Sequence, residues 1–353
     1  MVAGTSRNAR QEAIAPVEAR IIGLKGCGKS TLMTALGGRS DGVVATVRVG
    51  DPRIRALSEI FKPKKTTFAE FRVRVAVWPE ATGRKGEMDK YLDALSGAQV
   101  YLHVLRAFDN PVLGEEADPA GDLEKLDHEF LLADLIAIER AFERAKKQKL
   151  TDLARRSLER ARDTLETDVP LRDATGFDDD EVAFLRPYGF LTLVPQVVLV
   201  NLEAGTSPDT LGRVTEMAAG RQLLSFPFSD AAEVAGLSPE EQLEFSEALG
   251  LPGIAADLVN RAVFEQMGLI SFFTAGEDEV RAWPVRRGST AQKAAGAIHS
   301  DIERGFIRAE VVAYEQFMER KTMKACRDAG VLRLEGKGYP VADGDIMEFR
   351  FNV

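Results

Sequence analysis

The stretch G-L-K-G-C-G-K-S, from Gly23 to Ser30, has the spacing G-x-x-x-x-G-K-[ST] of a phosphate-binding loop. Glycines allow the backbone to turn several N–H groups inward, toward a phosphate. We expect Lys29 to reach the terminal phosphates of a nucleotide and the Ser30 hydroxyl to bind Mg²⁺. The loop and the start of the next helix therefore supply these candidate nucleotide-binding residues: Gly23, Lys25, Gly26, Cys27, Gly28, Lys29, Ser30 and Thr31.

The segments around this loop support the assignment. Residues 19–22 are typical of a short strand, and residues 31–36 are typical of a helix. Further strands are expected at 72–77 and 98–105, with a helix at 85–95 between them. Strands that alternate with helices predict an α/β fold, a doubly wound and mostly parallel sheet with helices on both faces.

The composition is that of a soluble globular protein with two or three domains. The chain has 353 residues, of which 45% are hydrophobic and 29% are charged. No apolar run approaches the roughly 18 residues that span a bilayer, so no membrane association is expected. The net charge of −9 disfavours binding to DNA through bulk charge. Two cysteines argue against a disulfide framework and fit a cytoplasmic protein, and three widely spaced histidines do not form a metal site.

The middle of the chain predicts a helical arm. Two apolar repeats at helical spacing run through a segment rich in charge, at Leu131, Leu135, Ile138 and Phe142 and at Ala154, Leu158, Ala161 and Leu165. Two helices with narrow apolar seams, turning near Lys149, predict an antiparallel coiled-coil hairpin. The arm is either a structural element or a partner-binding one, and the sequence leaves this open.

Strands return after the arm. A strand is expected at 192–200, directly before Asn201, and a strand with a loop at 223–229. Helices are expected at 238–249 and 254–267. The arm is therefore an insertion within the nucleotide-binding domain, and the candidate residues near the base are Asn201, Leu202, Phe228 and Ser229.

The last part of the chain predicts a separate small α+β domain with a mixed sheet. Its β-prone runs lie at 271–274, 280–283, 307–312 and 347–351, and its helical stretches lie near 290–299 and 314–329. The expected division is a disordered lead (1–18), a nucleotide-binding domain (19–118 and 190–268), the inserted arm (119–189) and the small domain (269–353).

Together these parts resemble the YchF/Obg-like ATPase family over nearly the whole chain after residue 18. The strongest likeness is in the last domain, in F-F-T-A-G-E-D-E-V-R-A-W at 272–283, A-A-G-A-I-H-S-D-I-E-R-G-F-I-R-A-E at 294–310 and the ending D-G-D-I-M-E-F-R-F-N-V. D-P-R-I-R-A-L-S-E-I-F-K-P-K-K at 51–65 and the arm entry at 118–135 also match. The resemblance implies a P-loop NTPase domain, an inserted coiled coil and a C-terminal TGS-like (β-grasp) domain.

The resemblance also implies an activity and partners. Members of the family are ATP-preferring NTPases linked to ribosomes and to translation or stress responses. For this chain that implies ATP, or alternatively GTP, together with Mg²⁺. It also implies docking on the ribosome or ribosomal RNA through the TGS-like domain and the arm.

The chain departs from the family where hydrolysis takes place. Only residues 39–42 separate the first helix from the next strand, which is too short for the family's first switch. Ser40 or Thr46 could take the place of its Mg²⁺-binding threonine. In the loop that carries a water-positioning histidine in the family, this chain has Val112, which cannot orient or deprotonate water.

Two further motifs are altered. E-A-T-G stands where the second switch has D-x-x-G, so Glu80 and Gly83 are the candidate catalytic residues and Glu80 joins Ser30 as a candidate Mg²⁺ ligand. The base-reading motif N-x-x-E becomes N-L-E-A, beginning at Asn201. Its carboxylate, Glu203, stands one position early, so ATP is favoured over GTP with weak discrimination.

Several alternatives remain open from the sequence. Cys27 is either a redox-sensitive thiol or a packed residue, and Phe228 either stacks on a purine or fills the core. For function, the first hypothesis is a purine nucleotide-binding protein whose hydrolysis is weak or lost. The alternative is a slow ATPase that switches between nucleotide states.

Overall fold

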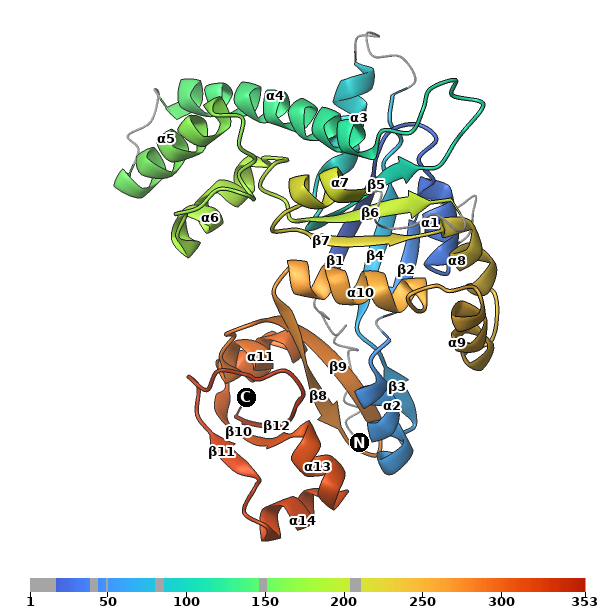
Figure 1. The fold of residues 1–353 in the computed structure, drawn as a ribbon. Helices are drawn as coiled ribbons and strands as arrows, with labels where there is room; N and C mark the ends of the chain where they lie inside the picture. The colour runs from blue at the N-terminus through green and yellow to red at the C-terminus, as the bar shows by residue number, and fades with distance from the viewer. Residues whose placement is uncertain are drawn as a thin grey trace, which may run out of the picture. The chain divides into compact units, whose positions relative to one another are not determined.

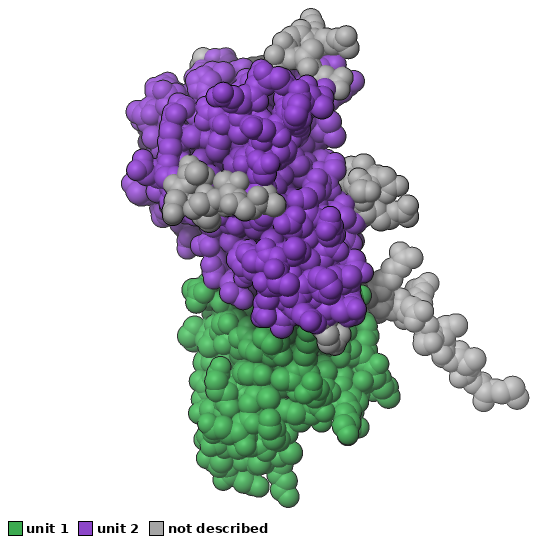
Figure 2. All heavy atoms as spheres, turned by 45° about the vertical axis from the view of Figure 1, so that its right-hand side comes forward, with its two compact units in different colours: residues 1–16, 48–70, 268–353 green, residues 17–47, 71–267 purple. Residues whose placement is uncertain are grey.

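The computed structural model describes residues 17–38, 44–48, 50–79, 86–145, 151–203 and 211–352. These residues form two compact units (Figure 2). The larger unit contains residues 17–47 and 71–267, and the smaller one contains residues 48–70 and 268–353. Most of the expected disordered lead at 1–18 lies outside the described residues.

The larger unit is built on a six-stranded sheet with the order β2-β4-β1-β5-β6-β7. β1 pairs in parallel with both β4 and β5, and the sheet continues in parallel through β6 to β7. This confirms the predicted α/β fold with a mostly parallel sheet. The strands are β1 (Val17–Ile22), β2 (Val44–Arg48), β4 (Glu70–Val75), β5 (Val100–Ala107), β6 (Gln196–Leu202) and β7 (Gln222–Phe226).

Helices cover both faces of this sheet (Figure 1). On one face lie α3 (Glu87–Leu95), α4 (Pro119–Ala145) and α7 (Gly212–Met217). The other face carries α1 (Lys29–Ala35), α8 (Phe228–Val234) and α10 (Ala255–Gln266), and α9 (Pro239–Ala248) packs beside α8. Within the described ranges, no helix is long and apolar enough to cross a membrane.

The inner strand β6 is buried along its whole length, because a parallel strand covered on both faces has no solvent side. Its position differs from the sequence expectation. The sequence predicts a strand from Thr192 to Val200, but the strand begins at Gln196 and continues to Leu202. The Thr192 backbone N–H and hydroxyl instead donate to Asp134 Oδ2 on α4, at 2.7 and 2.6 Å, so these contacts hold the segment before the strand out of the sheet.

The inserted arm is a helical hairpin of α4 and α5 (Asp152–Glu166), as predicted. The apolar repeats form its seam: Leu131, Ile138, Leu158, Ala161 and Leu165 are buried in one cluster, with Leu135 and Phe142 against it. The expected turn near Lys149 lies outside the described residues. A short helix, α6 (Asp179–Leu185), joins the arm through buried Glu181, which accepts hydrogen bonds from Arg156 and Arg160 at 2.9 and 2.8 Å.

A buried polar network connects the base of the arm to the sheet. Asp127 on α4 pairs with Arg172 and, at 2.9 Å, with Arg221. Arg221 also donates to Gln196 Oε1 at 2.5 Å, and Gln196 Nε2 lies 2.9 Å from Nδ1 of His103 on β5. His103 is fully buried, and no described residue contacts its Nε2 through a hydrogen bond. The histidine therefore has a structural position.

The smaller unit contains a second six-stranded sheet with the order β11-β10-β12-β8-β9-β3. Its strands are β3 (Lys65–Thr67), β8 (Leu269–Ala275), β9 (Glu279–Arg286), β10 (Phe306–Ala313), β11 (Arg333–Glu335) and β12 (Asp345–Phe351). The pairs β12–β8 and β9–β3 are parallel and the other three are antiparallel. α11 (Ala291–Ile298) packs its alanines on the core of the sheet. This confirms the mixed sheet that the sequence predicted, and it agrees with the β-grasp-like domain that the family resemblance implies.

Three details of this unit differ from the expected pattern. β3 pairs with β9, so residues 48–70, which include α2 (Pro52–Phe61), belong to this unit and not to the nucleotide-binding domain. The helix expected at 314–329 is two helices, α13 (Tyr314–Arg320) and α14 (Met323–Asp328), because Lys321 takes a left-handed φ of 63°. β11 and the short α12 (Ser300–Arg304) were not expected.

The burial of His103 predicts a pH dependence of stability. Burial lowers the pKa of His103 to about 3, with Asp127 opposing the shift and Arg221 and Arg172 adding to it. Below its ordinary pKa near 6.5 only the unfolded chain binds this proton, so stability is lost as the pH falls through that value. We expect about 2 kcal/mol of this loss between pH 7 and 5.

The test is urea unfolding of the wild type and of His103→Gln, which keeps a hydrogen-bonding partner for Gln196. Burial raises the pKa of Asp134 to about 6, and this carboxyl acts in the opposite direction over the same interval. The prediction is therefore the difference between the two proteins: the wild type must lose more stability than the variant. Parallel pH profiles would contradict it.

Candidate functional site

Three glycines shape the loop between β1 and α1. Gly23, Gly26 and Gly28 have φ of +139°, +76° and +104°, a region that residues with a Cβ rarely adopt. A Cβ on Gly23 would lie 2.4 Å from the Val104 carbonyl oxygen, and one on Gly28 would lie 2.3 Å from Asn201 Nδ2. The backbone thus follows the close, glycine-dependent path that lets N–H groups converge on an anion.

Lys29 begins α1 and folds back against the loop. Its Nζ donates to the carbonyl oxygens of Gly23 and Leu24, at 2.8 and 2.6 Å. Burial lowers the pKa of Lys29, and Cys27 nearby opposes that shift. The next residue, Ser30, is exposed at the first turn of the helix. The ammonium and the hydroxyl therefore lie beside the cradle, where a phosphate would compete with the two carbonyls for the ammonium.

Asn201 ties the loop to the end of β6. Its Nδ2 donates to the Cys27 carbonyl oxygen at 3.1 Å, and its Oδ1 accepts from the Phe228 backbone N–H at 3.0 Å. The first bond holds the phosphate loop against the end of β6. The second joins the start of α8, so one buried amide connects three segments that are distant in the sequence.

The structure places two base-contact candidates in the core. Phe228 is fully buried, with its ring centroid 4.9 Å from that of Phe226, so it fills the core and is not available to stack on a purine. Leu202 is buried among apolar residues of β5, α4 and α7. Ser229 is exposed at the start of α8, and its hydroxyl donates to Asp230 Oδ1 at 3.1 Å. Of the side chains expected near the base, Asn201 remains closest to the loop.

Cys27 is a packed residue of the loop. Its side chain is buried, and a Cβ on Gly23 would lie only 2.9 Å from its sulfur. Burial raises the pKa of the Cys27 thiol, although Lys29 opposes this. A reactive thiol needs an accessible thiolate. The structure thus favours the packed alternative over the redox-sensitive one.

A second loop, at 108–116, covers the outer side of Gly26. Buried Arg106 anchors its two ends by donating to the carbonyl oxygens of Phe108, Glu115 and Glu116. The side chain of Leu113 lies where a Cβ on Gly26 would come within 2.8 Å of it. The sequence pair Asn110-Pro111 in this loop is typical of a turn. Nothing in the sequence alone indicated that Leu113 contacts the phosphate loop.

The expected hydrolytic residues are not brought together in the described part of the chain. Val112 is 93% exposed in the same loop. Thr46 lies on the edge strand β2, which β4 separates from β1. Ser40, Glu80 and Gly83 lie outside the described residues.

The fit to the two expected ligands differs. The glycine cradle and Lys29 fit a phosphate chain, and a side chain at Gly23 or Gly28 would displace the loop because it would clash with the Val104 carbonyl or with Asn201. For Mg²⁺, the described residues contribute the Ser30 hydroxyl, and none of their His, Cys, Asp and Glu side chains group into a metal cluster. The second expected ligand, Glu80, lies outside the described residues.

Comparisons with known proteins agree with this architecture. The family model YchF-GTPase_C, described as "Protein of unknown function (DUF933)", matches residues 269–352. The chain is 38% identical over 360 residues to the ribosome-binding ATPase YchF of Haemophilus influenzae, and the alignment covers 94% of this chain and 98% of that protein. It is 35% identical to the Bacillus subtilis protein of that name, over 95% and 99% of the two chains. The solved structure of the Schizosaccharomyces pombe YchF GTPase matches with a TM-score of 0.82 at 26% identity, over 95% of this chain and 98% of that one.

The closeness of Gly28 to Asn201 yields a prediction. Gly28→Ala places a Cβ against Nδ2 at a positive φ, so we expect a loss of roughly 1–3 kcal/mol of stability and at least a tenfold loss of ATP affinity. Gly37→Ala is the matched control, because Gly37 follows α1 with φ +80° and a Cβ there would have nothing within 4 Å. It should keep its ATP affinity. Urea unfolding and titration with a fluorescent ATP analogue measure both effects, and equal ATP affinities in the two variants would refute the assignment.

Proposed function

Because the chain belongs to the YchF family, we propose that it is a purine nucleotide-binding protein that prefers ATP to GTP. The observation that carries the proposal is the glycine cradle of Gly23, Gly26 and Gly28, with Lys29 beside it. The side chain that holds this cradle, Asn201, accounts for the fixed position of the loop. The positive φ values of these glycines support the proposal, because they allow backbone N–H groups to turn toward a phosphate.

The base preference follows from the chemistry near Asn201. Its amide has a second N–H, beyond the one bound to Cys27, that can meet the Hoogsteen edge of a purine. Guanine readers add a carboxylate that accepts from the guanine N1–H and amino group. The nearest carboxylate after β6, Glu203, is exposed and stands one position early in the motif. The chain therefore lacks, at this motif position, the carboxylate that would favour GTP over ATP.

We further propose that hydrolysis is weak or lost. Phosphoryl transfer depends on positioning and charge stabilisation, and each 1.4 kcal/mol added to the barrier costs about tenfold in rate. Val112 is apolar where the resemblance implies a water-positioning histidine, and Thr46 lies on an edge strand. A protein that binds ATP without efficient turnover acts as a nucleotide-dependent binding module. The slow ATPase is the alternative that the hydrolysis experiment below decides.

Its proposed setting is the cytoplasmic ribosome. The two bacterial relatives described above are named ribosome-binding ATPases, and they share nearly the full length of this chain. Residues 269–352 of the C-terminal unit match a family model, which makes this unit, with the arm, the proposed docking element. The proposed partners are ATP or ADP with Mg²⁺ and the ribosome or its RNA.

The nucleotide proposal predicts that Lys29→Ala weakens ATP binding. Removing the ammonium leaves the phosphates without their nearest counter-charge, so we expect at least a tenfold loss of affinity by isothermal calorimetry. Lys90→Ala is the control, because Lys90 is an exposed lysine on α3. Should the wild type bind neither ATP nor ADP at millimolar concentration, the proposal fails.

The same proteins test hydrolysis in a single-turnover assay with γ-labelled ATP. If hydrolysis is lost, the wild type releases phosphate no faster than Lys29→Ala does. Phosphate release that disappears in Lys29→Ala and persists in Lys90→Ala would instead establish the slow ATPase.

The ribosome proposal predicts co-sedimentation. Purified protein should pellet with ribosomes through a sucrose cushion, and Lys29→Ala should change the bound fraction only in the presence of nucleotide. Protein that stays in the supernatant with ATP, with ADP and without nucleotide would contradict ribosome docking.

A further inference from the structure

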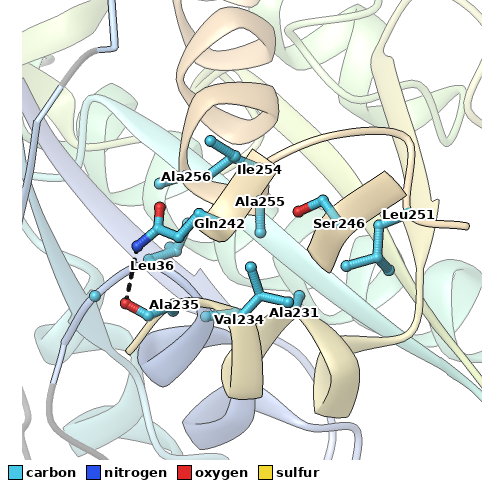
Figure 3. A pocket seen from close by; sticks show the side chains of 12 residues that line it. Leu36, Ala231, Val234, Ala235, Gln242, Ser246, Leu251, Ile254, Ala255 and Ala256 are labelled. Carbon is cyan, nitrogen blue, oxygen red and sulfur yellow. Dashed lines mark hydrogen bonds between the residues drawn. The ribbon is translucent and has the colours of Figure 1, made fainter. Parts of the chain in front are cut away.

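A small cavity lies between four helices on the α10 side of the sheet (Figure 3). It has a volume of about 70 Å³, several times the roughly 10–15 Å³ that one water needs. Its wall is formed by the end of α1, by α8, by α9 and by the start of α10. Gly37, which is exposed, is among the lining residues, so the cavity reaches the surface.

One polar group in this mostly apolar wall has no partner. Ser246 on α9 is 1% exposed, and its hydroxyl oxygen has no hydrogen bond to any described residue. Figure 3 shows its side chain pointing across the cavity toward Ala255 on α10. The other polar side chain there, Gln242, is already bound to the carbonyl oxygens of Ala235 and Leu237, at 3.2 and 2.9 Å. A buried hydroxyl without a partner is costly, and this one is placed to bind an atom that enters the cavity.

Large apolar side chains flank the cavity on the outer surface of α9. Leu243, Phe245 and Leu249 are 54%, 48% and 46% exposed. Successive residues of a helix are rotated by about 100° around its axis. Phe245 and Leu249 therefore lie on one side of the two cavity-lining residues Gln242 and Ser246, and Leu243 lies on the other side. Three half-exposed apolar side chains, two on α9 and one directly after it, lie around a cavity and form a surface of the kind that buries a partner.

The segment that contains α8 and α9 carries only negative charge. The sequence from Gln222 to Asn260 has no lysine, arginine or histidine, and its acidic residues are Asp230, Glu233, Glu240, Glu241, Glu244, Glu247 and Asp257. Glu241, Glu244 and Glu247 are exposed on α9, the helix that also carries Leu243 and Phe245. Nucleic acids and anionic membranes are repelled by such a rim. A positively charged polypeptide is attracted to it.

We propose that the α8–α9 surface, defined by the cavity and by Leu243, Phe245 and Leu249, is a docking site for a basic protein segment. The segment inserts one side chain into the cavity, and Ser246 favours an anchor with a polar atom, such as methionine or tyrosine. Its basic residues face the glutamates of α9. The described residues that line the cavity all belong to the larger unit and lie outside the arm.

The test is selection of peptides on the nucleotide-free full-length protein. A displayed library of random peptides of about 15 residues, roughly four helical turns, is first depleted on the Phe245→Glu/Leu249→Glu double variant. We expect the enriched peptides to carry a net positive charge and an apolar anchor. The affinity of a synthesised winner, measured by fluorescence anisotropy, should fall at least tenfold on the double variant and should weaken as salt rises from about 0.05 to 0.3 M.

Matched controls come from the arm and from α9 itself. Leu132 and Ile136 are 45% and 55% exposed on α4, so Leu132→Glu/Ile136→Glu adds the same charge elsewhere and should bind the peptide within twofold of the wild type. Glu244→Lys/Glu247→Lys leaves Leu243, Phe245 and Leu249 unchanged and should weaken peptide binding through charge alone. Circular dichroism confirms that each variant is folded.

Several outcomes would overturn the proposal. The first is a selection that enriches no peptide over the depleted library. The second is a set of enriched peptides that are neutral or acidic. The third is a peptide affinity that is unchanged in both α9 variants. Stronger binding of a single-stranded RNA oligonucleotide or of phosphatidylserine vesicles, lost in the same α9 variants, would assign the surface to a different class of partner. None of these results depends on ATP binding, so the proposal can fail while the proposed function stands.

Discussion

The amide of Asn201 holds together three segments on which the nucleotide site depends. It donates to the Cys27 carbonyl and accepts from the Phe228 amide, so the end of β6 keeps one arrangement with the phosphate loop and with the start of α8. Only an amide carries a donor and an acceptor on one short planar group. An aspartate would lose the donor, and an apolar residue would leave both buried backbone groups unpaired, at about 1–3 kcal/mol each.

This construction separates binding from chemistry. The cradle depends on backbone conformation at Gly23 and Gly28 and on one amide, all of which lie in or beside the buried sheet. Hydrolysis in this class of protein depends instead on side chains carried by surface loops. The loop at 108–116 keeps its anchor in Arg106, but it exposes Val112 to solvent and lays Leu113 against Gly26. A chain can therefore change its loops while the cradle persists.

The larger unit uses its two helical layers for different purposes. On one face, the network of Asp127, Arg172 and Arg221 reaches His103 and Gln196 and fixes the arm to the sheet. On the other face, α1 and α8 both begin at the nucleotide site and both end at the cavity beside α9. The acidic, apolar surface there is thus joined to the phosphate loop by two short helices.

The sequence alone determined the phosphate loop, the alternation of strands and helices, the seam of the arm and the mixed α+β end of the chain, because each is encoded in spacings of a few residues. Tertiary structure decided the rest. Four features depend on partners far away in the chain. Phe228 fills the core, β3 joins the C-terminal sheet, the strand after the arm starts at Gln196, and Leu113 lies over Gly26. Local patterns carry no information on such pairs, since competition for burial and hydrogen bonds is settled only when the distant segments meet.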